Sequence, residues 1–136
     1  MALFGLTKKT DYGLAMLAKL TKAPVGSRVS LTDMAEMGWP RAFMANIAKV
    51  LVESEIIDSK EGRGGGYALA HRPDEIKLRD VLEAMEGELR PVVCSLEEGI
   101  CPIDKSCSQR GFMARFTRRM EEMLGEYTVK DLIKDK

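Results

Sequence analysis

The chain has 136 residues, three cysteines, one histidine and no net formal charge at pH 7. This length suits one domain, or one domain with an appended helix, and leaves little room for a separate catalytic domain. No stretch of about 18 uncharged apolar residues occurs, and the first residues lack the apolar run of a signal peptide. The sequence therefore argues against a membrane-spanning protein and predicts a cytoplasmic one.

Zero net charge gives no support to nucleic-acid binding, but the charges are unevenly distributed. Residues 1–72 carry ten Lys or Arg against seven Asp or Glu, a net charge of +3, whereas residues 73–136 carry eleven against fourteen, a net charge of −3. A difference of this size arises easily by chance. Whether the chain binds nucleic acid must therefore be judged from the order of its predicted elements.

The first two predicted elements are helices. Apolar side chains recur at helical spacing from residue 7 to about residue 22, and the sequence APVGS then ends the pattern. Ser30 and Asp33 form a capping box that opens a second, shorter helix, LTDMAEM. Gly38, Trp39 and Pro40 end it, so a three-residue turn leads to the next helix.

A third helix is predicted over about residues 41–53, with Pro40 in its first turn. Its apolar side consists of Phe43, Met44, Ile47, Val50 and Leu51. Its opposite face is polar and cationic and carries Arg41, Ala42, Ala45, Asn46 and Lys49. Two short helices joined by a tight turn, the second with such a face, are typical of a helix-turn-helix.

A β-hairpin is predicted directly after the third helix. The strand-like runs IIDSK and GYALAH flank the glycine-rich tip EGRGG, which contains Arg63. A hairpin in this position is a wing, so the first part of the chain, residues 1–87, is predicted to be a winged helix-turn-helix DNA-binding domain. The fold class is mainly α with a small β-hairpin wing.

The outer face of the third helix has the chemistry of a DNA reader. Arg and Lys can bond guanine, Asn can bond adenine, and alanines keep the face low enough to enter a major groove and touch thymine methyl groups. Arg63 suits a phosphate or a minor groove. For an isolated helix the alternative is a solvated face, but the flanking elements favour DNA. The DNA-binding candidates are Lys8, Lys9, Arg41, Ala42, Ala45, Asn46, Lys49 and Arg63.

Residues 77–86 are helical by spacing, with Gly87 as the stop. The pattern then changes, because residues 88–107 hold two prolines, a glycine and all three cysteines without periodicity. This composition predicts a loop that is ordered by something it binds.

Cys94, Cys101 and Cys107 are spaced C-x6-C-x5-C. Thiolates select iron-sulfur clusters, zinc or Cu(I), and three of them supply three ligands of a four-ligand site. Candidates for the fourth ligand are a small molecule, a group from a partner subunit, or a carboxylate: Asp11, Glu97, Glu98 or Asp104. A structural zinc site and free thiols remain alternatives, and His71 is interpreted as structural.

From residue 108 to residue 124 an otherwise charged helix carries a narrow apolar stripe: Phe112, Phe116, Met120, Met123 and Leu124. Such a stripe needs a partner. A two-fold dimer doubles the DNA site that a winged domain reads. Residues 108–136 are therefore predicted to be a dimerisation helix with a C-terminal tail, and the chain a homodimer.

Enzymatic chemistry finds no support. The sequence GRGGG lacks the Lys-Ser/Thr of a phosphate-binding P-loop, and no histidine base lies beside a nucleophile. A redox enzyme would need a cysteine with a lowered pKa, and the sequence places neither a nearby histidine nor a C-x2-C motif next to these thiols.

The order LTKKTDYGL, LTDMAEM, WPRAFMANIAKVLVESEII, EGRGGGYALA, IKLRDVLEAMEG and CSLEEGICPIDKSC resembles the IscR and NsrR family of iron-sulfur winged-helix regulators over nearly the whole chain. The cysteine segment looks most like the group that regulates the SUF iron-sulfur assembly system. The resemblance implies that the three cysteines bind the cluster, and that Asp11 stands where the nitric-oxide-sensing branch has a carboxylate ligand from the other subunit. Arg110 replaces a histidine of the IscR branch, and Glu55 a common glycine.

The sequence thus predicts a homodimeric winged-helix regulator that binds a double-stranded DNA operator, is expected to repress transcription, and senses iron-sulfur status, redox state or nitric oxide. The cofactor is a 2Fe-2S or 4Fe-4S cluster. The alternative is a zinc-stabilised or thiol-switched winged-helix regulator without a cluster.

Overall fold

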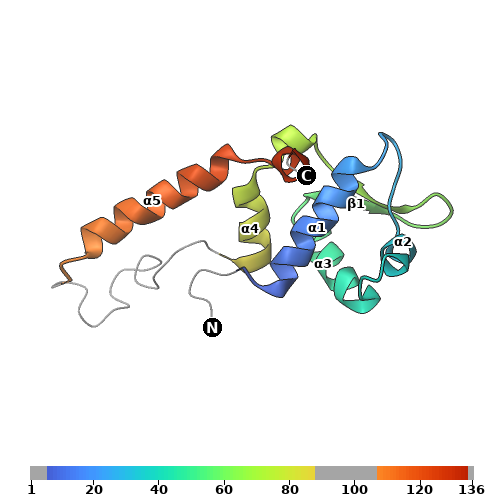
Figure 1. Ribbon diagram of the computed structural model, residues 1–136, viewed down its shortest axis with the longest axis horizontal. Helices are drawn as coiled ribbons and strands as arrows, with labels where there is room; N and C mark the ends of the chain where they lie inside the picture. The colour runs from blue at the N-terminus through green and yellow to red at the C-terminus, as the bar shows by residue number, and fades with distance from the viewer. Residues whose placement is uncertain (1–5, 88–106, 135–136) are drawn as a thin grey trace.

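The computed structural model describes residues 6–87 and 107–134. Figure 1 shows a compact body of helices with a hairpin, and one long helix, α5, that extends away from the body. The elements in chain order are α1 (Lys8–Lys22), α2 (Leu31–Glu36), α3 (Arg41–Glu53), β1 (Ile57–Lys60), β2 (Gly66–Leu69), the 3-10 helix η1 (Pro73–Glu75), α4 (Leu78–Glu86), α5 (Arg110–Glu126) and the 3-10 helix η4 (Val129–Ile133). The predicted fold class is confirmed.

Local signals set the starts of the first three helices. The Thr7 side chain caps α1 by accepting a hydrogen bond from the Thr10 amide. The predicted capping box of α2 is present, since the Ser30 hydroxyl accepts from the Asp33 amide at 3.0 Å and the Asp33 carboxylate accepts from the Ser30 amide at 2.9 Å. Pro40 is the N-cap of α3 rather than a residue of its first turn, a shift of one position.

The core of the body lies between α1, α3 and α4. Its fully buried side chains include Met16, Leu17, Met34, Met44, Ile47, Leu51 and Val81. Gly13 of α1 lets the three helices approach closely, because a Cβ at this position would lie 3.1 Å from Cε of Met85 and 3.6 Å from Cγ2 of Ile47. Of the apolar side predicted for α3, Phe43 and Val50 are only half-buried, and the buried Ala48 was missed.

The turn from α3 to the hairpin is a Schellman motif. The Ile56 amide donates to the Leu51 carbonyl and the Glu55 amide to the Val52 carbonyl, each at 3.0 Å. This geometry places Glu55 in the left-handed region, with a φ of 61°. The turn therefore forms with a glutamate at a position whose φ favours glycine.

The predicted wing is confirmed as an antiparallel hairpin, with Ile57 opposite Leu69 and Ser59 opposite Tyr67. A segment that the sequence did not mark as extended supports it, since Val29 forms a bridge with Tyr67 through hydrogen bonds of 3.0 and 2.8 Å. The Arg28 guanidinium also lies 2.6 Å from the Asp58 carboxylate. The base of the wing is thus fixed to the segment that precedes α2.

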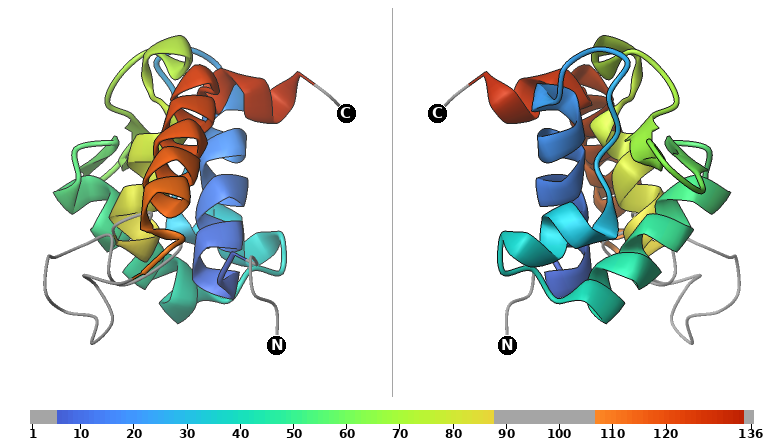
Figure 2. Two further views of the ribbon diagram at one scale, coloured as in Figure 1. Left: turned by 90° about the vertical axis from the view of Figure 1, so that its left-hand side faces the viewer. Right: turned by 90° about the vertical axis from the view of Figure 1, so that its right-hand side faces the viewer.

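The chain returns to the body after α5. The Leu78 amide donates to the Tyr127 carbonyl and the Val129 amide to the Ile76 carbonyl, both at 2.9 Å. Val129 is fully buried, and η4 packs against α1 (Figure 2). These residues were expected to be a tail, and no pattern in the sequence predicts their contact with the body. No helix in the described part of the chain is long and apolar enough to cross a membrane.

Candidate nucleic-acid interface

The helix-turn-helix is formed by α2 and α3, and its packing exposes the predicted outer face of α3. Buried Met34, Met44 and Leu51 fix these two helices to the core. Arg41, Ala42, Asn46 and Lys49 are consequently exposed, and Ala45 is half-buried. The five residues that the sequence placed on this face are on it.

The polar side chains of this face differ in their availability. The Arg41 guanidinium donates a hydrogen bond of 3.2 Å to the Thr32 hydroxyl at the start of α2. Within the described residues, neither Asn46 nor Lys49 has a side-chain hydrogen bond or an ion pair. Their donors are therefore free to bind a ligand, whereas Arg41 already has one protein partner.

Lys9 of α1 shares a surface with α3. A shallow hollow of about 410 Å³ is lined by Lys9, Phe43, Asn46, Ile47, Lys49, Val50 and Glu53. Two candidates more than thirty-five positions apart, Lys9 and Asn46, therefore meet at one place. Lys8 is exposed one residue earlier and is not among the residues that line this hollow.

Arg63 is exposed at the tip of the wing, which projects from the body beyond α2 (Figure 1). Gly62 and Gly64 on either side of it have φ values of 85° and 75°, which favour glycine. In winged domains a helix enters the major groove and an extended arm can reach the minor groove. An exposed α3 face and an arginine-tipped wing supply both parts.

The predicted metal site falls mostly outside the described residues, as do Cys94, Cys101, Glu97, Glu98 and Asp104. Cys107 is a free, half-buried thiol three residues before α5. Asp11 is exposed on the first turn of α1, His71 is exposed after β2, and Arg110 begins α5. In residues 6–87 and 107–134 no group of three His, Cys, Asp or Glu could hold a metal ion. The cluster remains a prediction.

A cluster of hydrogen bonds that sequence reasoning missed joins the end of α4 to the start of α1. The Glu86 carboxylate accepts from the hydroxyls of Thr7 and Thr10, both at 2.8 Å, and from the Thr7 amide at 3.3 Å. Burial raises the pKa of Glu86, but these hydrogen bonds outweigh it, so the pKa lies below its usual value. The two threonines, three residues apart at the start of a helix, could have indicated such hydrogen bonds, but the sequence does not show that Glu86 is their partner.

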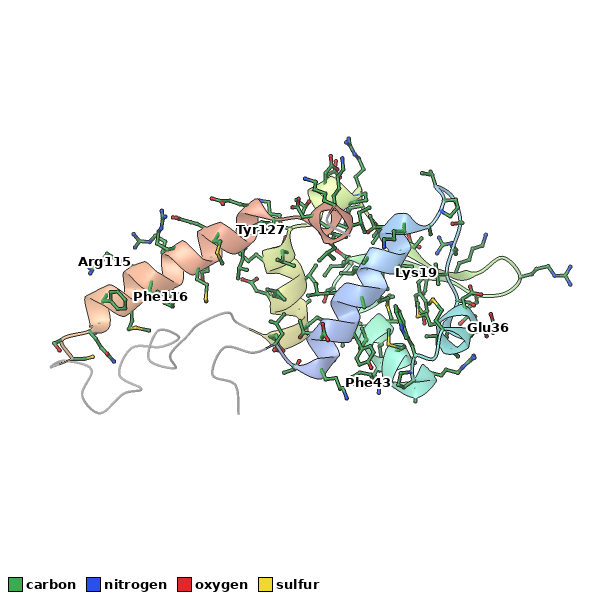
Figure 3. The ribbon with its side chains drawn as sticks, viewed as in Figure 1. Lys19, Glu36, Phe43, Arg115, Phe116 and Tyr127 are labelled. Atoms are coloured by element: carbon green, nitrogen blue, oxygen red, sulfur yellow. The ribbon has the colours of Figure 1, made fainter. Side chains whose placement is uncertain are left out.

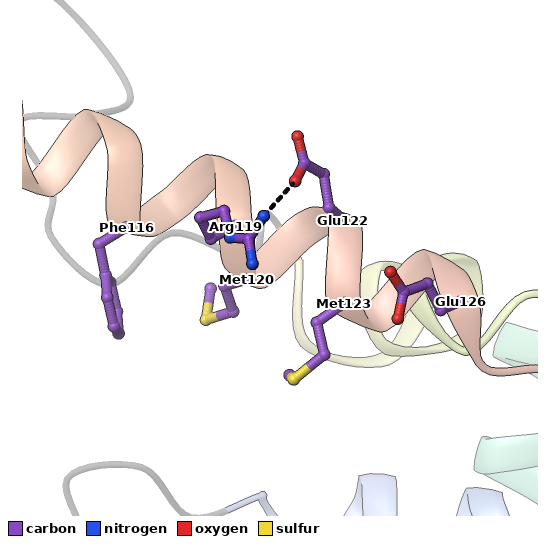
Figure 4. Close-up of a pocket in the computed structure, with 6 residues that line it drawn as sticks. All are labelled: Phe116, Arg119, Met120, Glu122, Met123 and Glu126. Atoms are coloured by element: carbon purple, nitrogen blue, oxygen red, sulfur yellow. Dashed lines mark ion pairs between the residues drawn. The ribbon is translucent and has the colours of Figure 1, made fainter.

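The free face of α5 carries the predicted apolar stripe. Phe112, Phe116 and Met123 are exposed, Met120 and Leu124 are half-buried, and the two phenylalanine rings stack with centroids 6.0 Å apart. Figure 3 shows Phe116 on the part of α5 that extends beyond the body. Figure 4 shows the hollow beside it, about 380 Å³, lined by Phe116, Arg119, Met120, Glu122, Met123 and Glu126.

Relatives support an interpretation of these surfaces as those of a regulator. Protein rrf2 of Nitratidesulfovibrio vulgaris is 31% identical over 131 residues, which cover 96% of this chain and 87% of the relative. The HTH-type transcriptional regulator NsrR of Shouchella clausii is 31% identical over 132 residues, 94% of this chain and 87% of the relative. Both similarities span the winged domain, the cysteine segment and α5.

Solved structures share the fold. CymR, titled the global cysteine regulator of B. subtilis, matches with a TM-score of 0.77 and 24% identity over 98% of both chains. T. potens IscR matches with a TM-score of 0.72 and 25% identity over 97% of this chain and 88% of the other. Staphylococcus aureus CymR in an oxidized form matches with a TM-score of 0.71 and 24% identity over 98% of both chains.

The family comparison covers almost the whole chain. Residues 6–135 match Rrf2, described as an iron-dependent transcriptional regulator. This is a family of regulators and not of enzymes, and its winged helix-turn-helix is the one built here by α2, α3 and the hairpin. The chain therefore belongs to the Rrf2 family of DNA-binding transcriptional regulators.

Proposed function

We propose that this protein represses transcription as a homodimer that binds a pseudo-palindromic operator with α3 in the major groove and Arg63 in an adjacent minor groove. The observation that carries the proposal is the outer face of α3. There Asn46 and Lys49 have free donors, and Lys9 lies beside them. A free amide such as that of Asn46 is what direct base reading requires, and a free ammonium such as that of Lys49 suits a backbone phosphate. Repression follows when the occupied operator excludes the transcription machinery.

The two copies would pair through α5. Its N-terminal part carries the cations Arg110, Arg115, Arg118 and Arg119, and its C-terminal part the anions Glu121, Glu122 and Glu126. An antiparallel arrangement therefore sets the arginine-bearing part of one helix against the glutamate-bearing part of the other. The exposed aromatic and methionine side chains would be buried between them, which an isolated amphipathic helix requires.

Phe116→Glu tests the dimer, because it places a charge in the centre of the apolar stripe. Val25→Glu is the matched control, since Val25 is fully exposed on a loop of the body. By sedimentation, wild type and Val25→Glu are expected to be dimers and Phe116→Glu a monomer. A wild-type monomer, or a Phe116→Glu dimer, would contradict this pairing.

We also propose that Cys94, Cys101 and Cys107 bind an iron-sulfur cluster, with Asp11 of the other subunit as the remaining ligand. The donor set fits, because three thiolates are the ligands that iron-sulfur clusters prefer. A cluster with one weak oxygen ligand supplies an iron that responds to iron supply, oxidants or nitric oxide. The family description as iron-dependent and the relatives named NsrR and IscR support the proposal.

The position of the cysteine segment suggests how the cluster affects DNA binding. The segment follows Gly87 at the end of α4, and its last cysteine stands three residues before α5. If cluster binding orders this segment, it would fix α5 relative to the body. It would thereby set the distance between the two DNA-binding α3 helices of the dimer. An affinity change of 10- to 100-fold requires only about 1.4–2.8 kcal/mol of coupling free energy.

Anaerobic purification, the visible spectrum and iron and sulfide analysis test this proposal against a Cys101→Ala variant. Brown wild-type protein with equal iron and sulfide, lost in the variant, is expected. Its operator affinity at fixed salt should then differ between the cluster-loaded and cluster-free forms. Equal affinities would refute the sensing role while leaving the DNA-binding proposal intact.

A thiol switch is the second candidate, because Cys107 is a free thiol that is not fully buried and a CymR relative was solved in an oxidized form. Colourless protein without metal, whose operator affinity falls on oxidation and recovers on reduction, would favour it. Colourless protein that contains zinc would instead favour a metal-stabilised regulator.

A further inference from the structure

A second polar surface lies between α3 and the wing. In an antiparallel pair, residues opposite each other point to the same face, and alternate residues share it. Ile57 and Leu69 are one such pair; Ile57 is buried, and its strand packs against α3. Ser59 and Tyr67 are the next pair on that same face. Their side chains therefore project beside α3, one step closer to the tip of the wing.

These two side chains form one wall of a groove. The groove is lined by Ala45, Lys49, Val52, Glu53, Ser59 and Tyr67 and has a volume of about 320 Å³. The hydroxyls of Ser59 and Tyr67 have no hydrogen-bond partner in the described part of the chain, and neither does the Lys49 ammonium. Three donors, one each from α3, β1 and β2, thus line the same groove.

The position of the groove identifies its occupant. One flank is the helix that fits a major groove, and the other leads to the arginine tip that fits a minor groove. In B-DNA the major and minor grooves are separated by a sugar-phosphate backbone, so a protein that enters both must straddle that backbone. Hydroxyl and ammonium groups are common phosphate ligands.

We propose that Ser59, Tyr67 and Lys49 form a clamp for a phosphodiester of the strand between the two grooves. This inference rests on the proposed DNA-binding function and deepens it, since it assigns backbone contacts to two hairpin residues that the sequence did not mark. A backbone contact sets the position of α3 and the wing on the duplex without reading bases.

Glu53 lines the same groove and opposes the clamp, because its carboxylate repels a phosphate. The clamp therefore predicts that removing this charge strengthens DNA binding. Glu53→Gln should raise affinity about two- to fivefold, equally for specific and random DNA, because a like charge near a phosphate weakens every backbone contact alike. An exposed helix residue with a purely structural role would not produce such a gain.

The test uses the full-length dimer and a duplex of about 30 base pairs that wild-type protein selects from a random pool. A random duplex of equal length serves as the non-specific probe. Tyr67→Phe and Ser59→Ala should each weaken binding to both probes by about three- to tenfold, the range of one net hydrogen bond. Tyr127→Phe, at the junction of α5 and η4 (Figure 3), removes the same hydroxyl elsewhere and should have no effect.

Salt dependence separates the three donors. Lys49→Gln should reduce the slope of log affinity against log salt by about one. Tyr67→Phe and Ser59→Ala remove only neutral hydroxyls and should leave this slope unchanged. In addition, replacing the clamped phosphate with an uncharged methylphosphonate should lower the DNA affinity of wild-type protein. The same replacement should lower the affinity of Tyr67→Phe only slightly, because that variant has already lost the contact. This lack of additivity at one phosphate is the direct signature of the contact.

The proposal is overturned if Tyr67→Phe and Ser59→Ala bind both probes as wild type does, or if their losses add fully to methylphosphonate substitution at every position. It is also overturned if they change the preference for the selected duplex, which would make them base readers. Failure of the proposed operator binding would give a different result. Wild-type protein would then enrich no duplex from the random pool, or Asn46→Ala would enrich the same duplex as wild type does.

Discussion

Glu55 closes the Schellman motif at the end of α3 and is the one residue other than glycine with a positive φ in the described part of the chain. In the left-handed region the Cβ approaches the following carbonyl oxygen, at a cost of roughly 1–2 kcal/mol. Glu55 is exposed, and its side chain has no bonding partner in residues 6–87 and 107–134. Replacing it with glycine therefore removes the strain without losing a contact.

Glycine also makes the unfolded chain more flexible, which offsets about 0.4–1 kcal/mol of the gain. Glu55→Gly should consequently raise the free energy of unfolding by a net amount of roughly 0.5–1 kcal/mol, or the melting temperature by about 2–4 °C. Glu55→Asn should give a smaller gain, since asparagine tolerates this region better than glutamate does.

Urea and thermal unfolding followed by circular dichroism, at equal protein concentrations, measure this effect. Ser54→Gly is the matched control, because Ser54 precedes Glu55 but has a φ of −86°, where glycine brings only the entropic loss. Ser54→Gly should be less stable than wild type. If Glu55→Gly is no more stable than wild type, the account of the strained turn is wrong.

Three further effects follow from the fold. The pKa of Glu86 is lower in the folded protein, so its contribution to stability is present above its unfolded pKa and is lost as pH falls through the folded value; Glu86→Gln should flatten the acid limb of a stability profile between pH 3 and 6. Leu51→Ala should cost about 2–5 kcal/mol because Leu51 is fully buried, whereas Val25→Ala, at a fully exposed loop residue outside α5, should leave the stability unchanged in the same unfolding assay. Gly65→Ala should weaken operator binding while leaving the helix content measured by circular dichroism unchanged, since a Cβ at this position would clash with the Lys60 carbonyl oxygen at the base of the wing tip. Operator affinity equal to that of wild type would show that the wing tip can adapt to the added Cβ.

The sequence predicted the elements that local signals specify. The Ser30–Asp33 capping box, the glycine after α4 and the glycine-rich tip each act within a few residues, so their outcome is readable from neighbours alone. The outer face of α3 was also predictable, because helical periodicity separates it from the buried side. These elements give the helix-turn-helix and the wing.

Contacts between distant segments were not predictable in the same way. The pairing of Val29 with Tyr67 and the position of Lys9 beside Asn46 depend on how helices pack, and no local pattern encodes that. Glu86 illustrates the same limit, since its acceptance of hydrogen bonds from Thr7 and Thr10 joins residues nearly eighty positions apart. The chemistry of each residue was visible, whereas its partner was not.

The return of η4 to the body has a consequence for biosynthesis. Tyr127 and Val129 bond to Leu78 and Ile76, and Val129 is buried, so the DNA-binding body is completed only by residues that follow α5. During translation the cysteine segment and α5 must both be made before the body can close. Nascent protein would therefore acquire its full DNA-binding body only after all three cysteines have been synthesised.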